Sequence, residues 1–221
     1  MTKARNSIPL VGIGLYSFAE AATYIGAPSH QLRRWMNGRL WRSQLAGSGV
    51  DGIGFKDLIE LRFVRALRAE GVSLAVVRRM FEIARQQRSS PYPFTSPHFR
   101  TDGKEIFLRT VDEIGERSLA DPARQRVVIQ KIIGSSIREG VELDSRGEAT
   151  RWYPLRRSKA VVLDPSRGFG KPILSASGVP TIALATAVVA EGGDERRVAR
   201  YFEVSLSCVR RAVQFEAERF R

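Results

Sequence analysis

Cysteine and histidine are scarce in this chain of 221 residues, which has one cysteine, Cys208, and two histidines, His30 and His98. A lone cysteine cannot form an internal disulfide, so the sequence favours a reducing compartment and predicts a cytoplasmic protein. Three such residues at these spacings match no zinc-ligand pattern, so we expect no metal ion and no cofactor. His30 is expected on the surface and Cys208 in a helix core.

Long apolar runs are also missing, because the longest, around 180–190, falls well short of the roughly 18 residues of a membrane span. The acidic residues are scattered and form no carboxylate pair in an apolar setting. The segment 168–172 contains glycines and Lys171, as phosphate-binding loops do, but Pro172 blocks the helix start that such a loop requires. We therefore predict a turn there, no catalytic residues, and a protein that is not an enzyme.

What the sequence has in excess is positive charge, since 36 Lys and Arg against 23 Asp and Glu give a net charge of +13. Residues 1–88 carry a net +8, residues 89–155 are neutral, and residues 156–221 carry +5. Thirty of the cations are arginine, which suits planar contacts with phosphate or carboxylate but is also typical of GC-rich genomes. The charge indicates a polyanionic partner.

The N-terminal region contains the pattern of a helix-turn-helix. Two short helices are predicted over 17–24 and 29–35. Ser17 can cap the first helix together with Glu20 in a capping box, and Gly26 supplies the turn. Two short helices joined by a glycine-containing turn are typical of this motif, although an ordinary two-helix corner with solvated arginines is the alternative.

The next segments predict a wing and two further helices. The glycine-rich stretch 37–54 is expected to form a short β-hairpin. Helices are expected over 56–69, with three arginines (Arg62, Arg65 and Arg68) on its polar side, and from Ser73 to Ala84. The segment 89–93, Ser-Ser-Pro-Tyr-Pro, breaks the pattern and is the best domain boundary.

The remainder predicts a β-rich middle followed by three helices. Asp102-Gly103 between two apolar segments indicates a hairpin over 99–108. We also expect a helix over 124–134, a hairpin over 137–155 and a strand over 159–163. Helices predicted over 180–191, 194–201 and 205–219 resemble a second helix-turn-helix-like unit.

The predicted fold class is mainly α with a small antiparallel β module (α+β). The expected domains are a winged helix-turn-helix over 1–90, a small β-rich module over 91–160 and a C-terminal helical unit over 161–221. In a helix-turn-helix, early residues of the second helix meet base edges, with Gln suited to adenine and Arg to guanine. The candidate DNA-contacting residues are Ser29, His30, Gln31, Arg33, Arg34, Arg39 and Arg42.

The N-terminal residues resemble the winged helix-turn-helix of MerR-like regulators over about 16–86. The resemblance lies in residues 16–22, Gly26, and residues 32–35, 54–58 and 67–74. The chain departs from ligand-sensing members in lacking the long dimerisation helix and the metal-binding cysteines that follow it. The resemblance therefore implies DNA binding without metal or drug sensing.

The C-terminal residues look like the family catalogued as domain of unknown function 433, on residues 162–165, 170–173, 178–181, 198–202 and 209–216. That family usually has an Arg before its Ile/Val-Pro element, where this chain has Ser177-Gly178. With residues 99–104 and 152–154, the combination resembles the long VapB-like antitoxins. This resemblance implies an antitoxin that is a homodimer, neutralises a PIN-like ribonuclease toxin and represses its own operon.

An inserted arginine could neutralise the clustered carboxylates that hold Mg²⁺ in such a nuclease. The sequence does not choose among the toxin-binding candidates Arg196, Arg197, Arg200, Arg210, Arg211, Arg219 and Arg221. The rival interpretations are a MerR-like regulator with no toxin partner, a nucleic-acid enzyme, and a toxin-neutralising adaptor whose helix-turn-helix no longer binds DNA.

Overall fold

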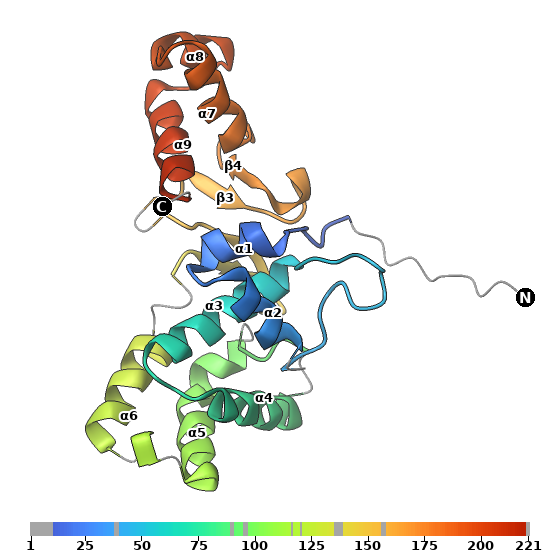
Figure 1. The fold of residues 1–221 in the computed structure, drawn as a ribbon, viewed down its shortest axis with the longest axis vertical. Coiled ribbons are helices and arrows are strands. Elements are labelled where there is room, and N and C mark those ends of the chain that lie inside the picture. Colours follow the sequence, from blue (N-terminus) through green and yellow to red (C-terminus); the bar gives the residue numbers. More distant parts are fainter. Residues whose placement is uncertain are drawn as a thin grey trace, which may run out of the picture.

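The computed structural model describes residues 11–37, 40–88, 91–94, 97–115, 117–119, 121–134, 139–155 and 158–219. Its helices are α1 (Phe18–Ile25), α2 (Ser29–Asn37), α3 (Phe55–Ala69), α4 (Leu74–Arg88), α5 (Pro97–Ile114), α6 (Pro122–Val128), α7 (Thr181–Ala190), α8 (Glu195–Tyr201) and α9 (Leu206–Arg219). Its strands are β1 (Val141–Leu143), β2 (Ala149–Trp152), β3 (Val161–Leu163) and β4 (Pro172–Leu174). The α+β class is therefore as predicted. Figure 1 places α4–α6 at one end, α7–α9 at the other and α1–α3 between them.

The N-terminal helix-turn-helix forms as the sequence predicts. The Ser17 hydroxyl accepts a hydrogen bond from the Glu20 amide (3.1 Å), and the Glu20 carboxylate accepts one from the Ser17 amide (2.9 Å), which completes the capping box. Gly26 ends α1 in the left-handed conformation, with φ of 69°. Leu32 and Trp35 of α2 then join the buried core on which α1 packs.

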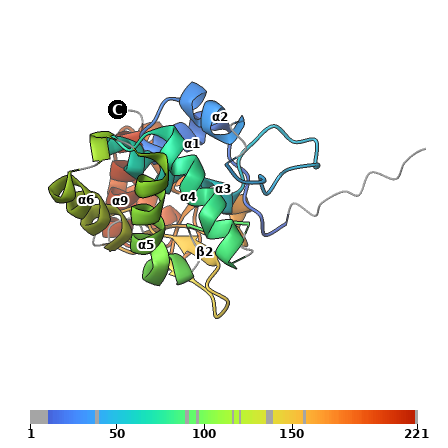
Figure 2. The same cartoon turned by 90° about the horizontal axis from the view of Figure 1, so that it is seen from below.

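The predicted wing hairpin is wrong for the residues that the structure describes. Residues 40–54 form turns, and their one β-bridge pairs Ile53 with Tyr16. Figures 1 and 2 both show this loop standing away from the helical body. A buried carboxylate at the start of α3 explains why no hairpin forms. It accepts hydrogen bonds from donors in the loop, including backbone amides that would otherwise pair across the two strands of a hairpin.

That carboxylate is Asp57, which is fully buried. It accepts hydrogen bonds from Trp41 Nε1 (2.6 Å), Ser43 Oγ (2.8 Å) and the amides of Gln44 (3.0 Å) and Gly54 (3.1 Å). Burial raises the pKa of Asp57, and these hydrogen bonds oppose that rise. The loop is thus fixed to α3 by side-chain and capping bonds instead of a ladder.

The predicted hairpin over 99–108 is also wrong, because these residues belong to α5. Phe99, Ile106 and Phe107 are buried with Val111, and this spacing follows the period of a helix instead of the alternation of strands. Phe99 stands edge-on to Phe94, with 4.8 Å between ring centroids. Packing of this apolar face on α4 overrides the local turn preference of Asp102-Gly103.

The four strands form one antiparallel sheet in the order β1-β2-β3-β4. The β1–β2 hairpin and strand β3 agree with the sequence, whereas β4 was not predicted. Strands on both sides of residue 160 therefore share one sheet. Arg62 of α3 lies 4.2 Å above the Trp152 ring of β2, and burial lowers the pKa of Arg62 to about 10.

The turn at 168–172, predicted from its glycines, docks on the start of α1. The Leu15 amide donates to the Phe169 carbonyl (3.0 Å), and the Tyr16 hydroxyl donates to the Gly170 carbonyl (2.8 Å). Lys171 Nζ lies 2.5 Å from Glu20 Oε1. These contacts join the sheet region to the helix-turn-helix across more than 150 residues of sequence.

The C-terminal helices form a three-helix unit, as predicted. They have a separate apolar core, made by Leu174, Leu184, Val188, Val198, Ala199, Val209 and Ala212. Asp194 caps α8 by accepting a hydrogen bond from the Arg197 amide (2.9 Å). Among the described residues, no helix combines the length and the apolar character that a bilayer crossing requires.

Candidate nucleic-acid interface

The second helix of the helix-turn-helix presents a polar face to solvent. Leu32 and Trp35 are buried and fix the orientation of α2. The opposite face carries five of the candidate DNA-contacting residues. His30, Gln31, Arg33 and Arg34 are exposed, and Ser29 is half-buried. A helix with one buried seam and one row of donors has the shape that enters a DNA major groove.

Arg33 is held in place on this face. Its guanidinium forms a two-pronged ion pair with Asp51 of the 40–54 loop, with Nη1–Oδ1 at 3.2 Å and Nη2–Oδ2 at 3.0 Å. It also lies 3.9 Å from the centroid of the Phe18 ring in α1. Arg33 therefore joins α1, α2 and the loop, and a phosphate would compete with Asp51 for it.

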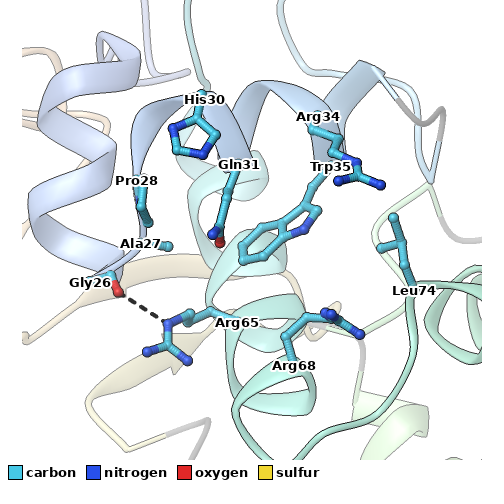
Figure 3. A pocket seen from close by; sticks show the side chains of 10 residues that line it. All are labelled: Gly26, Ala27, Pro28, His30, Gln31, Arg34, Trp35, Arg65, Arg68 and Leu74. Carbon is cyan, nitrogen blue, oxygen red and sulfur yellow. Dashed lines mark hydrogen bonds between the residues drawn. The ribbon is translucent and has the colours of Figure 1, made fainter.

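A basic cavity of about 480 Å³ opens between α2 and α3. Figure 3 shows Arg34 on one side, with Arg65 and Arg68 of α3 facing it across the hollow. Arg65 Nε donates to the Gly26 carbonyl at 3.1 Å, and Arg68 Nη1 donates to the Val72 carbonyl at 2.6 Å. Both α3 arginines are anchored through one nitrogen, so further N–H donors can bind a ligand.

The residues that line this cavity define its chemistry. They are Gly26, Ala27, Pro28, His30, Gln31, Arg34, Trp35, Arg65, Arg68 and Leu74. None of these ten is acidic, so the three guanidinium groups face the cavity without a carboxylate in its lining. Such a site attracts a polyanion, and phosphate oxygens match the planar donors of arginine.

The sequence predicts Arg65 and Arg68 on the polar side of their helix but does not assign them to the DNA-binding site. The signal was present, because these residues lie three apart on one helix face. What the sequence does not supply is the packing of both helices on α1, which leaves α2 and α3 on opposite sides of the cavity. Of the two loop candidates, Arg42 is exposed and Arg39 lies outside the described residues.

The C-terminal arginines divide into two groups. Arg197 pairs with Glu191 (3.1 Å) and bonds the Tyr201 hydroxyl (2.7 Å), and Arg210 pairs with Glu195 (2.8 Å). Arg196, Arg200 and Arg211 are exposed. Arg221 and the side chain of Arg219 lie outside the described residues. Within the part of the chain that the structure covers, no three His, Cys, Asp or Glu side chains group as metal ligands do.

The capped α1, the left-handed turn at Gly26 and the exposed polar face of α2 together define a helix-turn-helix domain. Comparison with known proteins agrees, since residues 16–83 match the family described as MerR HTH family regulatory protein. A curated relative from Mycobacterium tuberculosis (strain ATCC 25618 / H37Rv) is described as "Putative antitoxin VapB45". It is 26% identical over 191 residues, which cover 76% of this chain and 79% of that protein.

The fold as a whole resembles a solved structure, the X-ray crystal structure of Rv2018 from Mycobacterium tuberculosis. The TM-score is 0.72 with 23% sequence identity, and the match covers 95% of this chain and 99% of the other. At this identity the likeness concerns the fold alone. The arrangement of the N-terminal, sheet and C-terminal parts is therefore shared with a protein of nearly the same extent.

Proposed function

We propose that this chain is a DNA-binding transcription regulator whose α2 lies in the major groove of operator DNA. The carboxylate-free cavity formed by Arg34, Arg65 and Arg68 supports this proposal best. In this arrangement Gln31 and Arg34 contact base edges, while the two α3 arginines bind the phosphates that flank the groove. The chain acts by binding and not by catalysis.

We further propose that the regulator is an antitoxin that neutralises a PIN-like ribonuclease and represses its own operon as a homodimer. The description of the relative from Mycobacterium tuberculosis supports an antitoxin. The C-terminal unit also exposes large apolar side chains on α7, with Ile182 50% and Val189 80% accessible. Exposed apolar side chains on one helix suit a protein partner, and the C-terminal arginines suit an acidic nuclease centre.

Arg34→Ala tests DNA binding, with Arg126→Ala on the exposed side of α6 as a control that removes the same charge. The probe is a duplex from upstream of the chain's own gene, titrated by fluorescence anisotropy at several salt concentrations. Arg34→Ala should weaken binding about tenfold, as the loss of a base contact worth about 1–3 kcal/mol predicts, and it should lower the slope of log K against log salt because the groove loses a cation. Equal behaviour of the two variants would remove α2 from the DNA interface.

Co-expression tests the antitoxin. The tagged chain is produced with the product of the adjacent gene, and the purified material is examined for a complex with suppressed ribonuclease activity. Ile182→Ser combined with Val189→Ser changes two exposed side chains of α7 and leaves the sheet intact, and this variant should abolish co-purification. If no PIN-like gene is adjacent and no complex forms, the chain is a MerR-like regulator without a toxin. A complex together with failure to bind DNA would instead identify a toxin-neutralising adaptor, and Mg²⁺-dependent cleavage by the chain alone would identify an enzyme.

A further inference from the structure

The helix-turn-helix at 17–37 recurs at the C-terminal end of the same chain, at 194–214. Each position of the second segment follows its counterpart by 177 residues, as Ala199 follows Ala22. Both segments begin with a side chain that caps the first helix, Ser17 in one and Asp194 in the other. At this separation four residues are identical: Ala22, Tyr24, Arg33 and Arg34 recur as Ala199, Tyr201, Arg210 and Arg211.

The backbone of the turn recurs as well. The Ala27 amide donates to the Ala22 carbonyl (3.3 Å), and at the same separation the Val204 amide donates to the Ala199 carbonyl (3.0 Å). Each turn has one residue in the left-handed region at the equivalent position, Gly26 with φ of 69° and Glu203 with φ of 52°. The chain adopts this turn at Glu203 even though a Cβ disfavours it.

The start of the second helix is also repeated. The Leu32 amide donates to the Pro28 carbonyl at 3.2 Å, and the Val209 amide donates to the Ser205 carbonyl at 3.2 Å. Leu32 and Val209 are both fully buried, and both pack against the preceding helix of their unit. The two units thus share capping, turn geometry and the seam that orients the second helix.

Because the seam is the same, the face left to solvent is the same. The exposed residues His30, Arg33, Arg34 and Asn37 of α2 have exposed counterparts in α9, which are Ser207, Arg210, Arg211 and Gln214. The first arginine of each row, Arg33 or Arg210, is also held by the residue at the same position of the preceding helix. Arg33 lies over Phe18, and Arg210 pairs with Glu195, which occupies the position of Phe18 in the repeat. Arg34 and Arg211 are left as the outward arginines.

We infer that α9 is a second DNA-recognition helix, which binds double-stranded DNA through Ser207, Arg210, Arg211 and Gln214. Arg can pair with guanine and Gln with adenine, so this row carries the donors and acceptors of direct base readout. One chain therefore contacts two segments of DNA, through α2 and through α9, which lie at different levels of the molecule in Figure 1. The inference rests on the proposed function for the choice of probe DNA.

The test uses the full chain and the same upstream duplex, with anisotropy and hydroxyl-radical footprinting. Arg211→Ala should weaken binding about tenfold, lower the salt slope because the interface loses a cation, and erase one of two protected DNA segments. Arg34→Ala should erase the other segment, and Arg126→Ala should leave both. Gln214→Ala, which keeps the charge, should reduce discrimination between upstream and unrelated DNA with little change in salt slope.

Two results would overturn the inference. One is an Arg211→Ala protein that is folded by circular dichroism and binds DNA with the affinity and salt slope of Arg126→Ala. The other is loss of toxin co-purification by Arg211→Ala with DNA binding intact, which would make α9 a protein-binding surface. Failure of α2 to bind DNA is reported separately by Arg34→Ala, so the two helices are judged independently.

Discussion

Arg33 and Asp51 form a two-pronged ion pair that places a carboxylate beside the exposed face of α2. Both side chains are at least half exposed, so the pair contributes little to stability. Its effect on DNA is larger, because a phosphate that approaches Arg33 meets the negative charge of Asp51. The pair therefore holds Arg33 in the free protein and must open or share its donors when DNA binds.

Asp51→Asn should strengthen DNA binding by a few-fold and make its salt dependence steeper, because Arg33 gains freedom to contact a phosphate. Anisotropy across a salt series measures both quantities. The free energy of unfolding should change by less than about 1 kcal/mol, as expected for an exposed pair. If binding became weaker, Asp51 would be required to position the 40–54 loop or Arg33 for DNA.

Arg68→Ala and Gln31→Ala should have different signatures. Arg68 is placed to bind phosphate, so its loss should weaken binding to specific and unrelated duplexes by the same factor and lower the salt slope by about 0.9. Gln31 is placed to contact a base, so its loss should cost about 1–3 kcal/mol on the specific duplex alone. Paired titrations on two duplexes decide this, and reversed signatures would exchange the assigned roles.

The helices that are determined by residues close by in the sequence could be predicted from it. Ser17 with Glu20 and the left-handed Gly26 determine α1 and its turn within a few residues, and the exposed row on α2 follows from the helical period. The C-terminal helices follow for the same reason, since Asp194 caps α8. Capping and periodicity operate over one or two turns, so a single sequence reveals them.

What could not be predicted depends on contacts distant in sequence. Asp102-Gly103 has the local form of a hairpin turn, yet the packing of Phe99 and Phe107 makes the segment a helix. Asp57 organises a loop in which three of its four donor residues precede it by 13 to 16 positions. The cavity requires Arg65 and Arg68 of α3 to meet α2, and no periodicity within α3 encodes that meeting.

Gly170→Ala should destabilise the fold by about 2–4 kcal/mol. An added Cβ would overlap the Tyr16 hydroxyl, whose hydrogen bond to the Gly170 carbonyl is buried, and φ at Gly170 is 79°. Gly47→Ala is the matched control, because φ there is 88° but no atom lies within 4 Å of the added Cβ, so it should cost about 1–2 kcal/mol. Urea unfolding measures the loss of unfolding free energy in both variants. Equal losses would show that the contact between 168–172 and α1 contributes nothing to stability.

Acid should weaken the fold partly through Asp164. Burial raises the pKa of this carboxyl, but hydrogen bonds from Ser166 and from Arg151, at 2.9 Å, outweigh burial and hold its pKa below the usual range. A carboxyl whose pKa is lower in the folded state stabilises the fold above its unfolded pKa of about 3.9, and that stability is lost as the pH falls through the folded value. Asp164→Asn should therefore unfold at lower urea concentration than the native chain at pH 5 and 7, with the gap narrowing below pH 4. Asp112→Asn, at an exposed carboxylate, serves as the control. If the difference in urea midpoint between Asp164→Asn and the native chain stayed constant down to pH 3, the charge of Asp164 would not be what stabilises the sheet.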